Sequence, residues 1–472
     1  MTLDEIRANI LTLFGFEPTP DQRAALEGLL RFLVSREDRQ VFLLKGYAGT
    51  GKTSLMSAVI RFLLSVNYPC VLMAPTGRAA KVFSSYSGCP ATTIHKKIYR
   101  QKQVDGTQGG FCLGDNQHEH TLFFVDEASM ISNVSEDSAF GSGRLLDDLL
   151  QYVDDGRHCK LVLMGDTAQL PPVGREVSPA LDAATLRGLG MSVMQFELTQ
   201  VLRQEHESGL LANATHLREC IVQENVSALP RIRTNRTDVV ELQGEDLIEE
   251  LSASYREVGM DGCKVVCRSN KRAVLYNQGI RSRILYREEE LSTGDLLLVA
   301  KNNYYWSQAY PEIPFIANGD LVEVTRVRRT LEMYGFRFAD LEVRFPETDW
   351  EMQVRVLLDS LTAEAPALDA ASQQRLYEAV LEDYADCRSR KELYENLRRD
   401  PWFNALQVKY GYAMTCHKSQ GGQWNHIYLD QGWVTEEMMG ISYYRWLYTA
   451  LTRATDKLYL VNFGPEFLER GK

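Results

Sequence analysis

The chain of 472 residues has no feature that would place it in a membrane or outside the cell. No apolar run is long enough to cross a bilayer, and the N-terminus has neither the basic nor the apolar region of a signal peptide. None of the nine scattered cysteines forms a Cys-x-x-Cys pair, so a reducing compartment is the simplest interpretation. Low-complexity tracts are absent as well. We therefore expect an intracellular, soluble, globular protein, cytoplasmic and associated with the nucleoid if its source is bacterial.

The chain has fewer basic residues, 52, than acidic residues, 63. The formal net charge of −11 argues against a protein that wraps DNA by charge alone. A local basic groove that grips a few nucleotides remains compatible with it, because screening confines electrostatic attraction to short distances. At this length we expect roughly two to four domains.

What the sequence does contain is a complete phosphate-binding loop, Gly-Tyr-Ala-Gly-Thr-Gly-Lys-Thr, at residues 46–53. An apolar strand is expected at 41–44 and an amphipathic helix at 55–64, which is the setting that such a loop requires. Backbone N–H groups of the loop surround phosphate oxygens at the positive end of the helix. We expect Lys52 to reach the β- and γ-phosphates of ATP and Thr53 to hold Mg²⁺. The expected nucleotide-binding residues of the loop are Gly46, Ala48, Gly49, Thr50, Gly51, Lys52, Thr53 and Ser54.

Two further expected strands end in polar groups. Asp126 and Glu127 follow the apolar run 122–125, and adjacent carboxylates at the end of a buried strand must be paired or bind a metal. We expect Asp126 to hold Mg²⁺ and Glu127 to polarise the attacking water. The alternative is that they cap the following helix. Gln169 follows the strand at 161–164, and because the carboxyl ends of parallel strands line a ligand crevice, it is expected to touch the γ-phosphate or the water.

Three residues outside these strands complete the predicted ATPase site. Gln22 precedes the first strand, and its amide can both donate to and accept from an adenine edge. Arg203 and Arg453 lie in a second α/β region. Guanidinium groups that one domain supplies to a phosphate held by another act as arginine fingers, worth about 10³–10⁵ in rate. The alternative is that each is an ordinary surface arginine.

Three segments combine hydroxyl groups, basic side chains and turns rich in N–H groups, namely residues 74–81, 92–97 and 415–424. Such groups position a sugar-phosphate backbone without reading its bases. The alternative is that Thr76 and the neighbouring hydroxyls only cap helices. The candidate nucleic-acid contacts in these segments are Pro75, Thr76, Arg78, Lys81, Thr93, His95, Thr415, His417, Lys418 and Gln420.

The order of strands and helices indicates an α/β architecture with insertions. Short apolar strands alternate with helices from residue 36 to 200, which is typical of a parallel sheet, and residues 96–121 interrupt this pattern. A second alternation starts near residue 201. Residues 294–346 favour a small antiparallel barrel, with Asn318-Gly319 as a tight turn, and residues 371–399 favour a helix. The alternation resumes at Leu406.

Taken together, these segments resemble a superfamily 1 DNA helicase of the RecD and Dda type. The specific motifs are the phosphate loop, Val-Asp-Glu-Ala-Ser-Met at 125–130, Gly-Asp-Thr-Ala-Gln-Leu-Pro-Pro-Val-Gly at 165–174 and Tyr-Thr-Ala-Leu-Thr-Arg at 448–453. The Pro-Phe-Gly-Gly-type segment of the related Pif helicases is missing between residues 130 and 161, which favours the RecD and Dda branch.

This resemblance implies two RecA-like parallel-sheet domains with two insertions. The first domain would comprise residues 1–200, with a strand-separating pin at 96–121 that carries Phe111 near its tip. The second would comprise 201–293 and 405–472. An SH3-like barrel with a helical segment, at 294–404, would be inserted into the second domain.

The resemblance also implies function and partners. Lys52, Asp126, Glu127, Gln169, Arg203 and Arg453 would hydrolyse ATP with Mg²⁺, and Gln420 and Gly421 would couple DNA to the nucleotide. The activity implied is 5′→3′ movement on single-stranded DNA with unwinding at junctions, in repair, recombination or replication. The active form would be a monomer, with a single-strand-binding protein or recombination and replication proteins as partners. Two alternatives remain open: a translocase that unwinds poorly, and an ATPase subunit of a larger complex.

Overall fold

The computed structural model describes residues 1–470 except 105–106, 134–140, 201–207, 236, 304, 311–312, 314–315, 347 and 388. It does not describe the side chains of residues 101–104, 107–111, 390, 391, 394, 398 and 436. Within this part of the chain, every helix is too short or too polar to cross a membrane.

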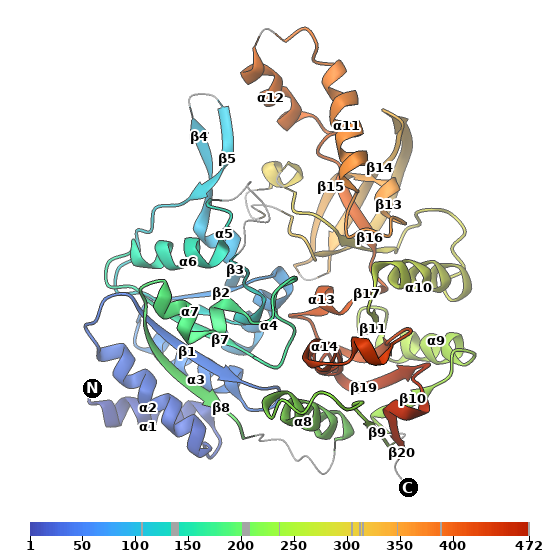
Figure 1. Ribbon diagram of the computed structural model, residues 1–472. Helices are drawn as coiled ribbons and strands as arrows, with labels where there is room; N and C mark the ends of the chain where they lie inside the picture. Colours follow the sequence, from blue (N-terminus) through green and yellow to red (C-terminus); the bar gives the residue numbers. More distant parts are fainter. Residues whose placement is uncertain are drawn as a thin grey trace.

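The first lobe is a parallel six-stranded sheet with helices on both faces (Figure 1). Its strands, in sheet order, are β3 (Ala91–Thr93), β2 (Cys70–Ala74), β6 (Leu122–Val125), β7 (Lys160–Gly165), β1 (Gln40–Gly46) and β8 (Ser192–Leu198). Its helices are α1 (Leu3–Phe14), α2 (Pro20–Val34), α3 (Lys52–Ser65), α4 (Gly77–Ser87), α5 (Ile94–Ile98), α6 (Leu145–Asp154) and α7 (Ala183–Gly188). The central strands β6, β7 and β1 are mostly apolar and buried, as expected for a sheet that is covered on both faces.

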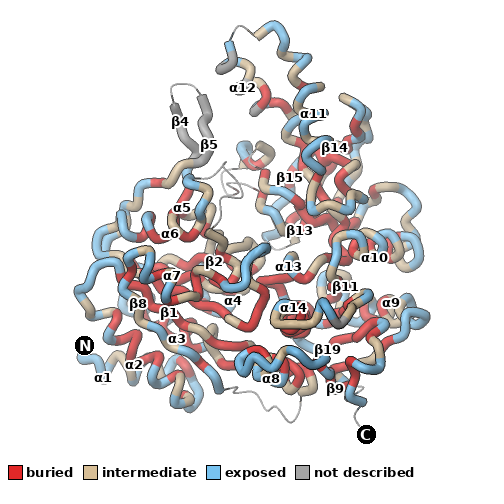
Figure 2. The backbone as a smooth tube through the Cα atoms, in the orientation of Figure 1, coloured by how far each residue is buried: buried red, intermediate tan, exposed pale blue. Residues whose placement is uncertain are grey.

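The second lobe is a parallel five-stranded sheet. Its strands, in sheet order, are β10 (Val239–Leu242), β19 (Ala454–Val461), β18 (Trp424–Asp430), β11 (Cys263–Cys267) and β17 (Ala413–Thr415). Its helices are α8 (Gly209–Val222), α9 (Leu247–Val258), α10 (Asn270–Arg283), α13 (Cys416–Ser419) and α14 (Ile441–Leu451). The short strands β9 (Ile232–Thr234) and β20 (Leu468–Arg470) pair beside it. Figure 2 shows that both lobes have continuous buried interiors.

A closed five-stranded barrel interrupts the second lobe. It consists of β12 (Leu296–Val299), β13 (Leu321–Met333), β14 (Phe336–Phe345), β15 (Trp350–Leu357) and β16 (Leu406–Tyr410). The predicted turn at Asn318-Gly319 is confirmed, because Asp320 N donates to Ala317 O at 3.1 Å and Gly319 has a φ of +97°. The barrel is not wholly antiparallel, since β15 and β16 pair in parallel. The chain leaves the barrel between these strands, and such an excursion is long enough to return in the same direction.

The helical segment between β15 and β16 is two helices, not one. They are α11 (Ala370–Glu382) and α12 (Arg390–Arg399). In α11, Leu376 and Val380 are buried against barrel residues. The break follows from Ser389, whose hydroxyl accepts from Glu392 N at 3.1 Å and starts a new helix.

The insertion in the first lobe is an antiparallel hairpin. Its strands are β4 (Tyr99–Val104) and β5 (Thr107–Leu113), which rise from α5 beside the barrel in Figure 1. Cα atoms of α12 and β5 approach within 8 Å, so the helical segment and the hairpin meet although about 280 residues separate them. The predicted fold class, with two RecA-like sheets, a hairpin insertion and a barrel with helices, is confirmed. The domain boundaries given above stay predictions.

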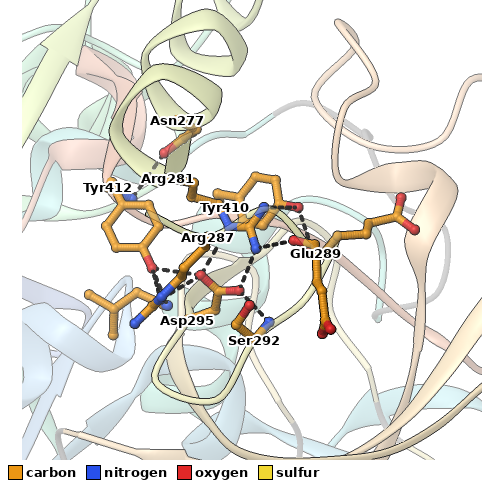
Figure 3. A network of polar contacts seen from close by, with 10 residues as sticks. Asn277, Arg281, Arg287, Glu289, Ser292, Asp295, Tyr410 and Tyr412 are labelled. Atoms are coloured by element: carbon orange, nitrogen blue, oxygen red, sulfur yellow. Dashed lines mark hydrogen bonds and ion pairs between the residues drawn. The ribbon is translucent and has the colours of Figure 1, made fainter. Parts of the chain in front are cut away.

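A buried polar network joins the barrel to the second lobe (Figure 3). The carboxylate of Asp295, at the start of the barrel, accepts from Arg281 of α10 at 3.0 Å and from Arg287 at 2.6 Å. The hydroxyl of Tyr412 donates to the same carboxylate at 2.8 Å, where the chain has just returned from the barrel. Asn277 of α10 accepts from Tyr412 N at 3.1 Å. The chain therefore enters and leaves the barrel at one fixed point.

Candidate functional site

The phosphate loop connects β1 to α3, as the sequence predicts. Gly49 and Gly51 have φ values of +80° and +77°, which glycine adopts without steric cost, and Gly51 directly precedes the helix. The Lys52 ammonium donates to Gly46 O and, at 3.2 Å, to Tyr47 O. A Cβ at Gly46 would lie 2.9 Å from side-chain atoms of Lys52 and Thr50, so only glycine fits here. The local geometry is that of an anion site at a helix N-terminus.

The two predicted acids stand next to this loop, at the end of β6. Asp126 Oδ1 accepts from Glu127 N at 2.9 Å, and Glu127 has a left-handed backbone with a φ of +53°. Burial, and after it the negative charge of Glu127, raise the pKa of the Asp126 carboxyl to about 7, against the hydrogen bond from Glu127 N and the charge of Lys52, which both lower it. A carboxylate whose charge is disfavoured in this way gains from a bound cation. The hydroxyl of Thr53 and the carboxylate of Asp126 are oxygen donors of the kind that Mg²⁺ takes, and their role as its ligands stays a prediction.

Gln169 lies in the loop that follows β7. The residue is buried, and its Oε1 has no hydrogen-bond partner within the described part of the chain. A buried carbonyl oxygen without a donor is costly, and a water or a phosphate-bound hydroxyl would satisfy it. This observation fits the predicted role beside the γ-phosphate.

Gln22 is buried between the start of α2 and the phosphate loop. Its side chain is 0% exposed. The amide nitrogen donates to Thr50 O at 2.9 Å, and the amide oxygen accepts from Thr19 N at 3.0 Å. Gln22 thus connects the start of α2 to the phosphate loop. Its contact with adenine stays a prediction, because the amide would have to give up these two hydrogen bonds first.

The two predicted arginine fingers have different outcomes. Arg203 lies outside the described residues. Arg453 is buried, and its guanidinium donates to Thr449 O at 3.0 Å, to Gly422 O at 3.2 Å and to Thr452 Oγ1 at 3.1 Å. All three acceptors belong to its own lobe. A contact between Arg453 and a phosphate therefore stays a prediction, and it requires the side chain to leave these acceptors.

The lobes meet at the phosphate loop through Tyr448 and Arg218 of the second lobe, for which the sequence predicted no role. The hydroxyl of Tyr448, on α14, accepts from Ala48 N at 2.9 Å and donates to Asp166 at 2.6 Å. Arg218 of α8 lies over the ring of Tyr47, with 5.0 Å between its Cζ and the ring centroid. No local pattern marks such contacts, although Tyr448 opens the Tyr-Thr-Ala-Leu-Thr-Arg motif.

A groove of about 450 Å³ runs between the first lobe and the barrel. Lys81 of α4 and Thr93, two of the predicted strand contacts, line one side of it. Asp320 and Trp350 line the other side, which belongs to the barrel. Thr76 and Thr93 also cap α4 and α5, accepting from Ala79 N and Lys96 N at 3.2 Å. Both hydroxyls therefore cap helices, as the alternative interpretation expected. A capping hydroxyl can still face the groove.

Other predicted strand contacts make bonds between parts of the protein. Arg78 donates to Gln423 O at 3.1 Å, Gln420 donates to Leu170 O at 2.8 Å, and Lys418 donates to Asn318 of the barrel. Burial lowers the pKa of Lys418 to about 8. The remaining candidates are partly or fully exposed, apart from Phe111, whose side chain lies outside the described residues; they are Pro75, His95, Thr415 and His417.

Gly421 holds the two lobes close together. Its φ is +73°, and a Cβ there would lie 3.0 Å from Ala79 Cβ and 3.1 Å from Thr76 Oγ1. The backbone after α13 therefore packs directly on the N-terminus of α4. Ser54 is exposed at the first turn of α3. The roles assigned to these residues stay predictions.

Comparisons with known proteins agree with this geometry. A family model described as an AAA domain matches residues 17–233, and one described as a UvrD-like helicase C-terminal domain matches residues 410–461. The chain is 24% identical to the ATP-dependent RecD2 DNA helicase of Deinococcus radiodurans over 89% of its own length and 46% of that protein. It is 22% identical to the ATP-dependent DNA helicase dda of Enterobacteria phage T4, covering 82% of this chain and 86% of that protein.

The solved structures that match the chain include the Pif1 helicase from Bacteroides in complex with ADP-AlF3 and ssDNA. That structure matches with a TM-score of 0.46 and 14% identity, over 96% of this chain and 95% of the other. The chain thus spans about half the length of one curated relative and most of the length of another.

Proposed function

We propose that the chain is a DNA helicase of superfamily 1B, similar to the RecD and Dda helicases, and that it acts as an ATP-dependent 5′→3′ DNA helicase. The proposed substrates are ATP and single-stranded DNA next to a duplex. Action as a monomer, in the cytoplasm and with single-strand-binding, recombination or replication proteins as partners, is part of the same proposal.

The observation that carries the proposal is the position of the groove. Lys81 and Thr93, two of the predicted strand contacts, line a groove of about 450 Å³ that the barrel closes from the other side. The phosphate loop lies in the same lobe, and α4 begins three residues after β2, at the carboxyl edge of the same sheet. A strand in this groove would contact the lobe that holds ATP and the insertion of the lobe that moves against it.

The residues of the first lobe can perform the chemistry of ATP hydrolysis. Mg²⁺ held by Thr53 and Asp126 would neutralise charge on the β- and γ-phosphates. Lys52 would exchange its loop carbonyls for phosphate oxygens. Glu127, next to the metal ligand, would polarise the water that attacks, and the unpaired Oε1 of Gln169 would help to orient it. A ligand-driven shift between two conformations supplies ~5 kcal/mol. This exceeds the free energy of about 1.4 kcal/mol by which one base-pair step opposes opening.

The first experiment measures ATPase activity with and without single-stranded DNA, and then unwinding of duplexes with a 5′ or a 3′ tail. We expect stimulation by DNA and opening of the 5′-tailed duplex only. Opening of the 3′-tailed duplex alone would refute the polarity. Lys52→Ala is the negative control, and full ATPase activity in that variant would refute the assignment of the site.

A second experiment separates a helicase from a translocase that unwinds poorly. Replacing residues 101–111 by Asn-Gly shortens the hairpin while keeping the pairing of Tyr99 with Leu113 and of Arg100 with Cys112. We expect this variant to keep its DNA-stimulated ATPase activity and to lose unwinding. Equal unwinding by both proteins would show that the hairpin is not a pin.

Glu127→Gln tests the chemical step by itself. The amide is nearly the same size but cannot act as a base, so we expect ATP hydrolysis to fall by about 10²–10⁴ with ATP binding retained. Unwinding by the isolated wild-type chain would also exclude the alternative of an ATPase subunit that depends on a larger complex.

A further inference from the structure

One hydroxyl group of the second lobe connects two loops of the first lobe. Tyr448 is 1% exposed on α14, and its hydroxyl accepts from Ala48 N, inside the phosphate loop, at 2.9 Å. The same hydroxyl donates to Asp166 Oδ2, directly after β7, at 2.6 Å. Both ATP-binding loops of the first lobe are therefore hydrogen-bonded to one side chain of the opposite lobe.

The directions of these bonds are fixed by chemistry. A backbone N–H can only donate, so the phenol oxygen accepts from Ala48 and its own proton goes to Asp166. The other carboxylate oxygen of Asp166 accepts from Ala168 N at 2.9 Å. Burial and the charge of Asp166 hold the pKa of Tyr448 far above its usual value, so the phenol stays protonated. Donation to a carboxylate strengthens the phenol oxygen as an acceptor.

Neighbouring contacts attach the same helix to the loop after β7. Thr449 Oγ1 accepts from Leu170 N at 2.8 Å, and Gln420 Nε2 donates to Leu170 O at 2.8 Å. The segment that begins with Tyr448 ends with Arg453, just beyond the end of α14. Hydrogen bonds thus connect the phosphate loop and the loop after β7 to the helix that leads to Arg453.

We propose that Tyr448 is a positioning residue that couples the phosphate loop to α14 and thereby to the second lobe. The amide of Ala48 has a single hydrogen, so the phenol oxygen and a phosphate oxygen compete for it. When a triphosphate takes this N–H, Tyr448 is released from the loop and α14 is free to move. The inference rests on the proposed function, because it concerns how ATP drives the lobes of a helicase.

The test compares Tyr448→Phe with Tyr444→Phe. Tyr444 is 2% exposed on the same helix, and its hydroxyl donates to Ala228 O at 2.9 Å, outside the phosphate loop. We expect Tyr448→Phe to bind a fluorescent ATP analogue about two- to tenfold more tightly, because a competing hydrogen bond is lost. Its DNA-stimulated kcat should fall about tenfold, because ATP binding can no longer free α14 by breaking the hydrogen bond between Tyr448 and Ala48.

Opposite changes in ATP affinity and kcat are not what simple damage produces. Damage to the fold would weaken ATP binding, lower kcat and lower Tm in both variants. Weaker ATP binding by Tyr448→Phe, a stimulated kcat within twofold of wild type, or an equal loss in Tyr444→Phe would each overturn the inference.

A double-mutant cycle with Asp166→Asn provides an independent measurement. Residues that act through one path give non-additive effects, so Tyr448→Phe combined with Asp166→Asn should lose no more kcat than the worse single variant. Additive losses would overturn the inference. If DNA does not stimulate the ATPase activity of the wild-type protein, the proposed function is refuted instead. The comparison of ATP affinity between Tyr448→Phe and the wild type would still test the role of Tyr448.

Discussion

Arg78 of α4 lies over the indole ring of Trp424, with its Cζ 3.9 Å from the ring centroid, although the two residues belong to different lobes. The guanidinium also donates to Gln423 O at 3.1 Å. A cation above an aromatic face and a hydrogen bond to the adjacent backbone hold α4 against the start of β18. Arg78 therefore connects the two lobes in this structure, and its predicted contact with DNA stays a prediction.

The salt dependence of DNA binding distinguishes these two roles. Loss of one phosphate contact lowers the slope of log K against log salt by about 0.7 on single strands. We expect Lys81→Ala, in the groove, to show this decrease and Arg78→Ala to leave the slope unchanged. Arg78→Ala should instead lower the stability by about 1–2 kcal/mol, because the cation–π contact is lost. An equal decrease of the slope in both variants would make Arg78 a DNA contact after all.

Trp350 offers an aromatic surface to a strand in the groove. It is 37% exposed at the start of β15 and lies across the groove from Lys81. Stacking of a base on an aromatic ring contributes about 1–3 kcal/mol, so we expect Trp350→Ala to weaken binding of single-stranded DNA by that amount at every sequence. The salt slope should not change, because no charge is removed.

Trp433 is the matched control for this measurement. It is 80% exposed and does not line the groove, so Trp433→Ala should leave DNA affinity unaltered. Equal affinities of Trp350→Ala and the wild type would show that the barrel wall does not hold bases.

Local patterns were sufficient for the elements that carry the ATPase motifs. The run before Gly46, the acids after Val125 and the polar loop after Met164 each place their chemistry at the end of an apolar strand, and parallel pairing brings these ends to one edge. The order of the motifs was enough to predict the resemblance to the RecD and Dda helicases, to which the chain is similar in sequence. The second helix at 390–399 could also have been found, because Ser389 followed by Glu392 is a capping signature.

Contacts between distant segments left no local signal. Tyr448 meets Ala48 across 400 residues, and Arg78 meets Gln423 across 345. Each of these side chains is ordinary for its element, so only the packing of the lobes shows that it joins them. The same holds for Gln22, whose buried amide bonds to Thr50 O could not be read from spacing.

The junction between the barrel and the second lobe should be sensitive to a single charge. Asp295 is buried between the guanidinium groups of Arg281 and Arg287. Asp295→Asn leaves these two cations without a counter-charge, so we expect a loss of about 3–5 kcal/mol of stability. Hydrogen exchange should rise first at residues 286–296 and 406–412, where the chain enters and leaves the barrel.

Asp349→Asn is the control, because Asp349 is paired with Arg344 at the surface and such pairs contribute about 0–1 kcal/mol. A loss below 1 kcal/mol for Asp295→Asn would mean that solvent reaches the junction and compensates the arginines.

Lys264 makes stability depend on pH in the alkaline range. It is fully buried on β11, with its ammonium donating to Met260 O at 3.0 Å, and burial lowers its pKa to about 8, with the charge of Arg78 adding to the effect. The folded pKa is below the unfolded one, so the unfolded state binds more protons between about pH 8 and pH 10.4. The free energy of unfolding should therefore rise with pH across this window. Below about pH 8 the folded protein is destabilised in full by the buried ammonium of Lys264.

Lys264→Met removes that cost, so we expect its Tm to exceed that of the wild type by about 2–4 °C at pH 7. The difference should close by about pH 10.4, where the wild-type lysine is neutral in the folded state. Lys271→Met, which removes an exposed lysine paired with Glu364, should show no such convergence. The contrary outcome is a difference in Tm between Lys264→Met and the wild type that stays constant from about pH 7 to about pH 10.4. That result would show that the Lys264 ammonium is solvated or compensated in the folded protein.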